Sequence, residues 1–176
     1  MSKRLDRRLV AVMFTDMVGY TALMQADERL GLDKRDLYMS ALERHHVAFG
    51  GTIVQRLGDG SMSMFPSSLD AVLAAIEIQW ELAAKDVPVR IGVHVGEVVV
   101  DPERLTGVAV NIAARIESFA VPGGVMLSDS VFDQIKNRSD VGVVRLHQRR
   151  VPDHVGEHHG DDPPIEPLTH RASSRS

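Results

Sequence analysis

The chain has 176 residues, of which 44% are hydrophobic and 25% are charged, and its formal net charge is −4. This length and composition are typical of one ordinary globular domain with a hydrophobic core. The negative charge offers no basic field to a nucleic-acid backbone, so a DNA or RNA polymer is disfavoured as a partner. Because no cysteine is present, disulfides, thiolate metal sites and cysteine nucleophiles are excluded.

The amino-terminal segment does not have the pattern of a signal peptide. Its apolar run begins at Leu9 and is ended by Asp16, before a small-residue cleavage site. No stretch approaches the roughly 20 apolar residues that a membrane span needs. We therefore expect a cytoplasmic protein that does not enter a membrane.

The first half of the chain predicts a strand, a helix and a hairpin. Residues 9–14 form an apolar run rich in β-formers, as in a strand covered on both faces. A helical pattern then extends to about residue 49, where two glycines stop it. The hairpin has strands over residues 52–57 and 61–65 and a turn over residues 58–60.

The second half begins with a helix that follows Pro66. Ser67 and Asp70 resemble a capping box at its start. Its predicted buried stripe is Leu69, Val72, Leu73, Ile76, Trp80 and Ala83. Residues 87–101 predict a long strand or a pair of strands.

A further helix is predicted over residues 108–119. Its predicted apolar face consists of Val108, Ile112, Ile116 and Phe119. A turn, a short strand and a short helix follow within residues 121–135, and residues 141–146 predict a last strand. Strand, helix, strand, strand, helix, strand is the order of a ferredoxin-like α+β sandwich, an antiparallel-rich sheet with helices on one face.

The domain organisation follows from a change of composition near residue 147. We expect a lead-in over residues 1–8 and one folded domain over residues 9–146. Residues 147–176 hold five of the eight histidines and four of the eight prolines, with almost no apolar periodicity. We expect that segment to be a solvated, disordered tail with an atypical end to the fold.

Two carboxylates stand at points where chemistry is favoured. Asp16 follows a buried strand and precedes a helix start, where the backbone N–H groups of Val18, Gly19 and Tyr20 suit a phosphate beside a cation. Taken alone, Asp16 is better explained as a helix cap and Asp59 as a turn residue. The predicted sheet places the end of the first strand beside the hairpin tip, so the two carboxylates could share two divalent cations.

Asn111 and Arg115 lie on the same side of their predicted helix, beside its apolar stripe. Arg offers a fixed charge and a donor fork for phosphate oxygens, although a solvated polar face is the better explanation of the pair taken alone. His45 and His94 are interpreted as structural histidines. No phosphate-binding loop of the Walker or Rossmann type follows any strand.

Four blocks of sequence together resemble a known family. They are "VMFTDMVGYT", "GGTIVQRLGDGSMSMF", "VRIGVHVGEVV" and "GVAVNIAARIES", and they resemble the catalytic domain of class III nucleotide cyclases, the adenylate and guanylate cyclases. The resemblance runs from about Leu9 to Leu146, with the blocks in the family's order and spacing. It implies a head-to-tail homodimer whose active sites each draw residues from both subunits.

The resemblance also implies a role for each matching residue. Asp16, Asp59 and the backbone carbonyl of Met17 would hold two Mg²⁺ or Mn²⁺ ions, and Arg90 would contact the terminal phosphates. From across the interface, Asn111 would position the ribose and Arg115 would stabilise the transition state. The implied reaction is attack of the 3'-hydroxyl of ATP on its α-phosphate, which gives 3',5'-cyclic AMP and pyrophosphate.

Three departures from the family bear on substrate and activity. Gln55 stands where adenylate cyclases have lysine, and Arg104 where they have aspartate or threonine, so the choice of purine stays open and GTP is a candidate side substrate. Glu103 could replace Arg104 as a reader of the base. The family's carboxyl-terminal lysine is missing, although Arg149 or Arg150 could supply its charge. The alternative hypothesis is a catalytically weak or silent module that binds nucleotide or dimerises.

Overall fold

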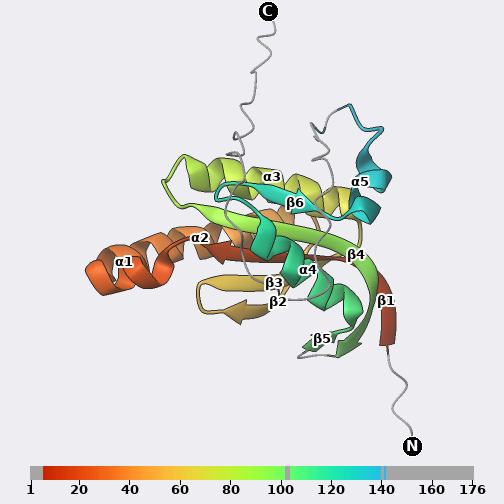
Figure 1. The fold of residues 1–176 in the computed structure, drawn as a ribbon, viewed down its shortest axis with the longest axis horizontal. Helices are drawn as coiled ribbons and strands as arrows, with labels where there is room; N and C mark the ends of the chain where they lie inside the picture. The colour runs from red at the N-terminus through yellow and green to blue at the C-terminus, as the bar shows by residue number, and fades with distance from the viewer. Residues whose placement is uncertain (1–5, 102–103, 140, 142–176) are drawn as a thin grey trace, which may run out of the picture. The chain divides into compact units, whose positions relative to one another are not determined.

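The computed structural model describes residues 6–101, 104–139 and 141, which belong to the first of two compact units, residues 1–143 and 144–176. The strands are β1 (Asp6–Met17), β2 (Thr52–Leu57), β3 (Gly60–Phe65), β4 (Val89–Asp101), β5 (Arg104–Thr106) and β6 (Val125–Leu127) (Figure 1). The helices are α1 (Tyr20–Ala26), α2 (Glu28–Ala48), α3 (Ser68–Ala83), α4 (Val108–Phe119) and α5 (Asp129–Ile135).

The strands form one sheet in the order β2-β3-β1-β4-β5, with β6 also paired to β4. β1 is antiparallel to both β3 and β4. The free edge of β4 takes β6 in parallel near its start and β5 antiparallel at its end. The order of the first four strands is that of the ferredoxin-like fold, which confirms the predicted fold class.

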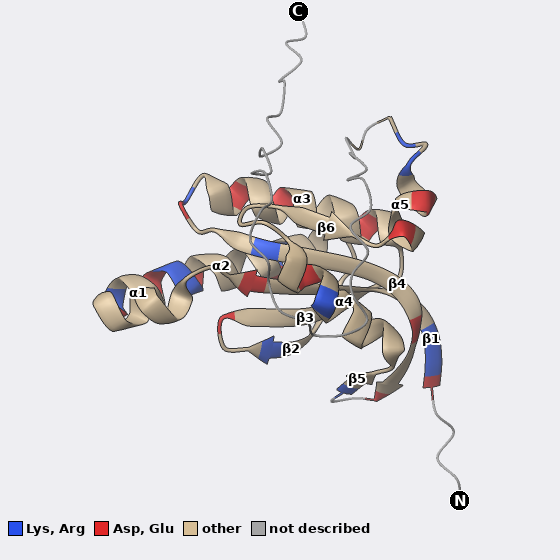
Figure 2. Cartoon of the chain, in the orientation of Figure 1, with Lys and Arg blue, Asp and Glu red and all other residues tan. Residues whose placement is uncertain are grey.

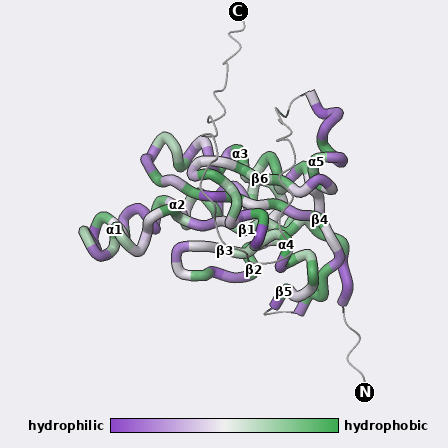
Figure 3. Tube along the Cα trace, viewed as in Figure 1, coloured by the Kyte–Doolittle hydropathy of each residue, from purple (hydrophilic) through white to green (hydrophobic). Residues whose placement is uncertain are grey.

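Both faces of the sheet are covered by helices. Side chains alternate along β1, so its successive residues enter two different core clusters. Ala11 and Met13 lie in a core cluster with residues of α2, α3 and α5. Val10 and Val12 lie in a second cluster with Ala109 and other residues of α4. The prediction placed all helices on one face of the sheet. α2, α3 and α5 lie on one face, as predicted. α4 departs from the prediction, because it covers the opposite face and crosses in front of the sheet in Figure 1. Figure 3 shows apolar stretches along the central strands and along α3 and α4.

The packing face of α4 differs from the predicted one. Val108 and Phe119 were expected to be buried, yet they are 74% and 51% exposed, whereas Ala109 and Ala113 are buried. The reason lies in β4: a Cβ added at Gly92 would lie only 2.2 Å from a backbone nitrogen of α4. Glycine at this contact lets the α4 backbone lie directly on the strand, with Ala109 and Ala113 buried and Val108 and Phe119 outside. Ile112 and Ile116, the other two residues of the predicted face, are half-buried.

The helix before β4 also turns a different face inward. Trp80 was placed in its buried stripe and is 54% exposed. The buried residues of α3 include Ala74, Ala75, Ile78 and Leu82, because a row of alanines lets the helix approach its neighbours closely. The predicted start is confirmed, since the Ser67 hydroxyl accepts a hydrogen bond from the Asp70 N–H at 3.3 Å.

Other predicted boundaries are refined. The helix expected up to residue 49 is two helices, divided at Asp27, whose side chain accepts from the Leu30 N–H and caps α2. The strand expected over residues 87–101 is the single strand β4. The predicted last strand, except Val141, and the predicted tail lie outside the described residues. Within the described part of the chain, no helix combines the length and apolarity needed to cross a membrane.

Candidate active site

The sheet brings the two predicted metal-binding carboxylates to one place. Asp16 is paired with Gly60 in the β1–β3 ladder, and the Met17 N–H donates to the Asp59 carbonyl at 2.9 Å. Gly58, with φ 75°, provides the left-handed conformation that the turn before Asp59 requires. Asp16 is not a helix cap, since α1 starts after Gly19 without a side-chain cap. The predicted neighbourhood of strand end and hairpin tip is therefore confirmed.

Arg90 lies beside Asp16 on the next strand. The two residues are directly paired between β1 and β4, and the Arg90 guanidinium donates to Asp16 Oδ2 at 2.6 Å. The Arg90 Nε lies 3.4 Å from Glu117 Oε1 on α4. The hydrogen bond with Asp16, and then the negative charges of Glu117, Asp16 and Asp59, raise the pKa of Arg90. Figure 2 shows acidic and basic residues of β1, β4 and α4 gathered where these elements meet.

Glu117 was missed by the sequence analysis. Its side chain is 14% exposed, and burial, followed by the charge of Asp16, raises its pKa, while Arg90 lowers it. Neither Glu117 Oε1 nor Arg90 Nε has a hydrogen-bond partner, although both atoms are buried. The available signal was spacing: Glu117 is one helical turn after Ala113, so it lies on the face of α4 that packs on the sheet.

A buried group of hydroxyls lies behind the carboxylates and was also not predicted. Thr15 Oγ1 is 2.6 Å from the Tyr38 hydroxyl and 2.7 Å from Ser61 Oγ. Burial above all raises the pKa of Tyr38 to about 12, so it remains a neutral phenol. Because Thr15 precedes Asp16 and Ser61 follows the hairpin turn, these hydrogen bonds tie β1 and β3 to α2 next to the site.

Asn111 and Arg115 are not part of this cluster in the single chain. Both side chains are exposed on α4. Arg115 is two residues before Glu117, a rotation of about 200° around a helix, so it faces away from Arg90 and Asp16. The same outer side of α4 carries the exposed Val108 and Phe119. This side of α4 is therefore open for contact with another molecule.

The proposed base-reading residues are exposed on the two edge strands. Gln55 follows a register shift in β2, and Arg104 begins β5. Three strands separate β2 from β5 in the sheet, yet Cα atoms of the two strands come within 8 Å of each other. The sheet is therefore curved enough to bring these edges together.

One of the three backbone N–H groups predicted to bind phosphate already donates a hydrogen bond within the chain. The Val18 N–H donates to the Pro88 carbonyl at 2.9 Å, so this donor is already engaged in the described structure, and a substrate contact of Val18 stays a prediction. Gly19 and Tyr20 are the donors that remain of the predicted three. The Met17 side chain is buried in the core, which leaves only its backbone to act in the site. Of the two histidines interpreted as structural, His45 bonds to Glu81 at 2.8 Å, and His94 is half-buried with its pKa lowered by burial.

The donor set suits a divalent cation. Carboxylate and carbonyl oxygens are the ligands that Mg²⁺ prefers, and Asp16 already binds a cationic group through one oxygen. In the ranges that the structure describes, the Asp59 carboxylate forms no hydrogen bond or ion pair. No group of three or more metal-binding side chains occurs among those residues, so the two aspartates would need backbone or substrate oxygens to complete a coordination shell.

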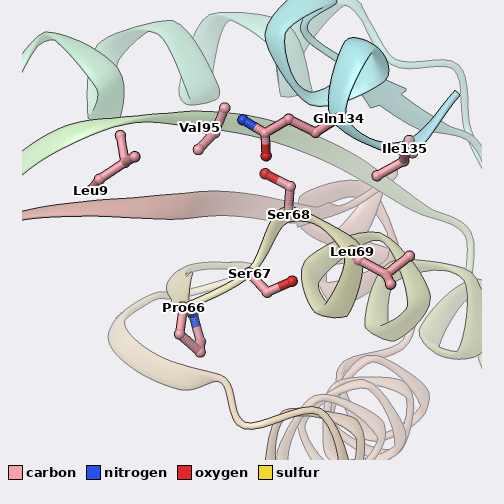
Figure 4. A pocket seen from close by; sticks show the side chains of 8 residues that line it. All are labelled: Leu9, Pro66, Ser67, Ser68, Leu69, Val95, Gln134 and Ile135. Carbon is pink, nitrogen blue, oxygen red and sulfur yellow. The ribbon is translucent and has the colours of Figure 1, made fainter.

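A cavity of about 340 Å³ lies elsewhere, at the amino end of α3. Figure 4 shows the Gln134 side chain directed toward Ser68 across this cavity, between Leu9 and Leu69. Leu9 is seven residues from Asp16 along β1, a distance of roughly 20 Å in an extended strand. The cavity is therefore separate from the carboxylate cluster.

Comparisons with known proteins agree with this geometry. Residues 3–158 match the family described as the adenylate and guanylate cyclase catalytic domain. A Rhizobium meliloti (strain 1021) protein named "Putative adenylate cyclase 3" is 37% identical over 150 residues, which cover 78% of this chain and 25% of that protein. A pH-sensitive adenylate cyclase of Mycobacterium tuberculosis (strain CDC 1551 / Oshkosh) is 31% identical over 70% of this chain and 32% of its own length. The chain thus spans about a quarter to a third of these two relatives.

A solved structure supports the same assignment. The adenylate/guanylate cyclase/hydrolase from Silicibacter pomeroyi has a TM-score of 0.76 and 30% identity, covering 86% of this chain and 94% of that chain. The adenylyl cyclase CyaB from P. aeruginosa has a TM-score of 0.71 at 22% identity and supports the fold alone. The sequence resemblance, the strand order and the paired aspartates lead to one conclusion: the chain belongs to the adenylate and guanylate cyclase catalytic domain family.

Proposed function

We propose that the chain converts ATP into 3',5'-cyclic AMP and pyrophosphate at two sites formed by a homodimer. The observation that carries this proposal is the junction of β1 with the hairpin, where the Met17 N–H bonds the Asp59 carbonyl and Asp16 lies beside Arg90. Two acidic side chains and one guanidinium at the end of three strands are the groups that handling a triphosphate requires.

Asp16 and Asp59, with the Met17 carbonyl, would hold two Mg²⁺ or Mn²⁺ ions. Such ions lower the pKa of a bound hydroxyl and neutralise phosphate charge. The chain's own contribution is to fix the two carboxylates: β1 and β3 hold them in register, and the Thr15, Tyr38 and Ser61 hydroxyls stiffen the strands behind them. Rigid placement favours an in-line geometry between the 3'-hydroxyl and the α-phosphate.

The remaining groups would orient substrate and stabilise charge. Arg90 would bind the terminal phosphates with its donor fork, helped by the N–H groups of Gly19 and Tyr20. Asn111 and Arg115 face away from their own carboxylates, so they would serve the site of a partner subunit docked on the outer side of α4. There Asn111 would position the ribose, and Arg115 would meet the charge that develops during phosphoryl transfer.

Gln55 and Arg104 would select the purine from the neighbouring edges of β2 and β5. An amide both donates and accepts, so Gln55 can hydrogen-bond to adenine or guanine. We therefore propose ATP as the main substrate and GTP as a side substrate. The other candidates for base and phosphate contacts, Glu103, Arg149 and Arg150, lie outside the described residues.

The direct test measures cyclic AMP and cyclic GMP formed from ATP and GTP, side by side, with Mg²⁺ or Mn²⁺ and over a range of protein concentrations. The proposal predicts a cyclic product and a rate per subunit that rises with concentration as dimers form. Asp59→Ala should abolish the rate, whereas Asp36→Ala, which removes an exposed carboxylate of α2, should keep it. A silent module would instead bind nucleotide or dimerise without forming product under either metal.

A further inference from the structure

Arg90 holds one of the two carboxylate oxygens of Asp16, the side chain that would bind a metal ion. Its guanidinium donates to Asp16 Oδ2 at 2.6 Å, and this contact follows from the direct pairing of the two residues between β1 and β4. Their side chains are only 33% and 26% exposed, so water screens the contact less than it would a surface ion pair. A cation that binds Asp16 must therefore displace Arg90 or share the carboxylate with it.

Arg90 has a second acidic neighbour that keeps it near the site when it leaves Asp16. Glu117 Oε1 lies 3.4 Å from Arg90 Nε, and neither atom is hydrogen-bonded, so a small rotation of the guanidinium can complete this pair. Glu117 comes from α4 and Asp16 from β1, so one carboxylate attracts Arg90 within the sheet and the other attracts it toward the helix that covers the sheet. The Glu117 side chain is only 14% exposed, so a negative charge on it is costly. A nearby Arg90 guanidinium offsets that cost.

We propose that Arg90 is an internal competitor for the metal-binding oxygen of Asp16, that Glu117 weakens this competition by drawing Arg90 toward α4, and that a bound triphosphate removes it. The proposal rests on the proposed function, because the triphosphate is the substrate assigned there. The consequence is that metal and nucleotide bind cooperatively. Phosphate oxygens bind the Arg90 guanidinium, and the Asp16 carboxylate is then free to bind the cation. Glu117 acts in this scheme as a positioning residue for Arg90.

The test measures Mn²⁺ binding to the nucleotide-free protein by electron paramagnetic resonance, which reports free Mn²⁺ directly. Arg90→Gln should tighten Mn²⁺ binding by at least about fivefold, a typical lower bound for coupling between sites. Arg35→Gln is the matched control, because the substitution also removes one positive charge. Arg35 donates to the carbonyl of Gly58, in the hairpin turn that carries Asp59, at 3.1 Å. The control should change Mn²⁺ affinity by less than about twofold.

Glu117→Gln should act in the opposite direction and weaken Mn²⁺ binding by about two- to fivefold, because Arg90 then stays on Asp16. Loss of one negative charge would also weaken binding, so the substitution is repeated in the Arg90→Gln background. An effect of Glu117 that disappears there supports the proposal, and one that persists unchanged overturns it. Arg90→Met, which is also uncharged, serves as the background if circular dichroism shows that Arg90→Gln does not fold.

A second readout separates this proposal from the proposed function. At saturating ATP, the phosphates engage Arg90 and the competition is absent. The Mn²⁺ concentration for half-maximal activity should therefore differ little between wild type and Glu117→Gln. That difference should be smaller than the difference between their Mn²⁺ affinities without nucleotide. If wild type forms cyclic product but binds Mn²⁺ with the same affinity as Arg90→Gln, the proposed competition is rejected and the proposed function stands. A wild-type protein that forms no cyclic product would reject the proposed function instead.

Discussion

Gly92→Ala tests whether the close contact between β4 and α4 positions the site. A Cβ at this position would lie 2.2 Å from the Glu117 backbone nitrogen and 2.5 Å from its Cα. Ordinary contact begins at 3.4 Å, so the strand or the helix must move by about 1.2 Å. Because the obstructing atoms are backbone, no side-chain rotation can relieve the clash. We expect a loss of about 1–3 kcal/mol in the free energy of unfolding, the usual cost of overpacking.

The matched variant is Gly96→Ala, four residues further along the same strand. Its Cβ would lie 2.7 Å from the Ala109 Cβ, which is a side-chain atom that Ala109→Gly removes. Urea unfolding followed by circular dichroism would give the free energies of the single and double variants. Ala109→Gly alone should cost up to about 1 kcal/mol of helix propensity.

The two glycines should then behave differently in double-mutant cycles. Ala109→Gly should relieve part of the cost of Gly96→Ala and add independently to Gly92→Ala. The packing argument would be refuted if Gly92→Ala cost less than about 0.5 kcal/mol, or if Ala109→Gly relieved both variants equally. Since α4 carries Asn111, Arg115 and Glu117, Gly92→Ala should also lower cyclase activity in the fraction that remains folded.

Three further predictions concern other parts of the fold. Tyr38→Phe removes a hydroxyl that lies 2.6 Å from Thr15 Oγ1, and we expect a lower urea midpoint, equivalent to about 1 kcal/mol. Hydrogen bonds from Arg44 and Lys85 lower the pKa of Glu81 from 4.5 to about 2, so its stabilisation is present above pH 4.5 and is lost as the pH falls toward 2. Unfolding of wild type and Glu81→Gln from pH 7 to pH 2 should show a difference of roughly 1 kcal/mol that shrinks in acid, because the partners are partly exposed and screened. Phe119→Ser should raise the dimer dissociation constant in sedimentation experiments, whereas Val47→Ser, at an exposed position of α2, should leave it unchanged.

The sheet and the aspartate pair were predictable because both depend on chain order. A strand that ends at Asp16, followed by a helix and a hairpin with Asp59 at its tip, has few right-handed arrangements, and the ferredoxin-like one places these ends together. The family blocks reinforced that arrangement, and the β1–β3 register agrees with it.

The face of α4 was not predictable from its own periodicity. Val108 and Phe119 have the spacing of a core stripe, but the contact is decided by two glycines of β4. Gly92 lies against the backbone of Glu117, and Gly96 lies against the Cβ of Ala109. Glu117 belongs to the same packed face of α4, which only its contacts with Gly92 and Arg90 reveal. The Thr15, Tyr38 and Ser61 hydroxyls come from three elements, and no short pattern links residues that meet only after folding.

The central claim is that each site needs carboxylates from one subunit and α4 from another. The most direct measurement mixes two purified variants, Asp59→Ala and Arg115→Ala, and follows cyclic AMP formation from ATP with Mn²⁺. Each variant alone should be inactive, and an equal mixture should recover about one quarter of the wild-type rate, since half of the dimers are mixed and each holds one intact site. If the wild type is active and the mixture remains as inactive as its components, a site shared between subunits is contradicted.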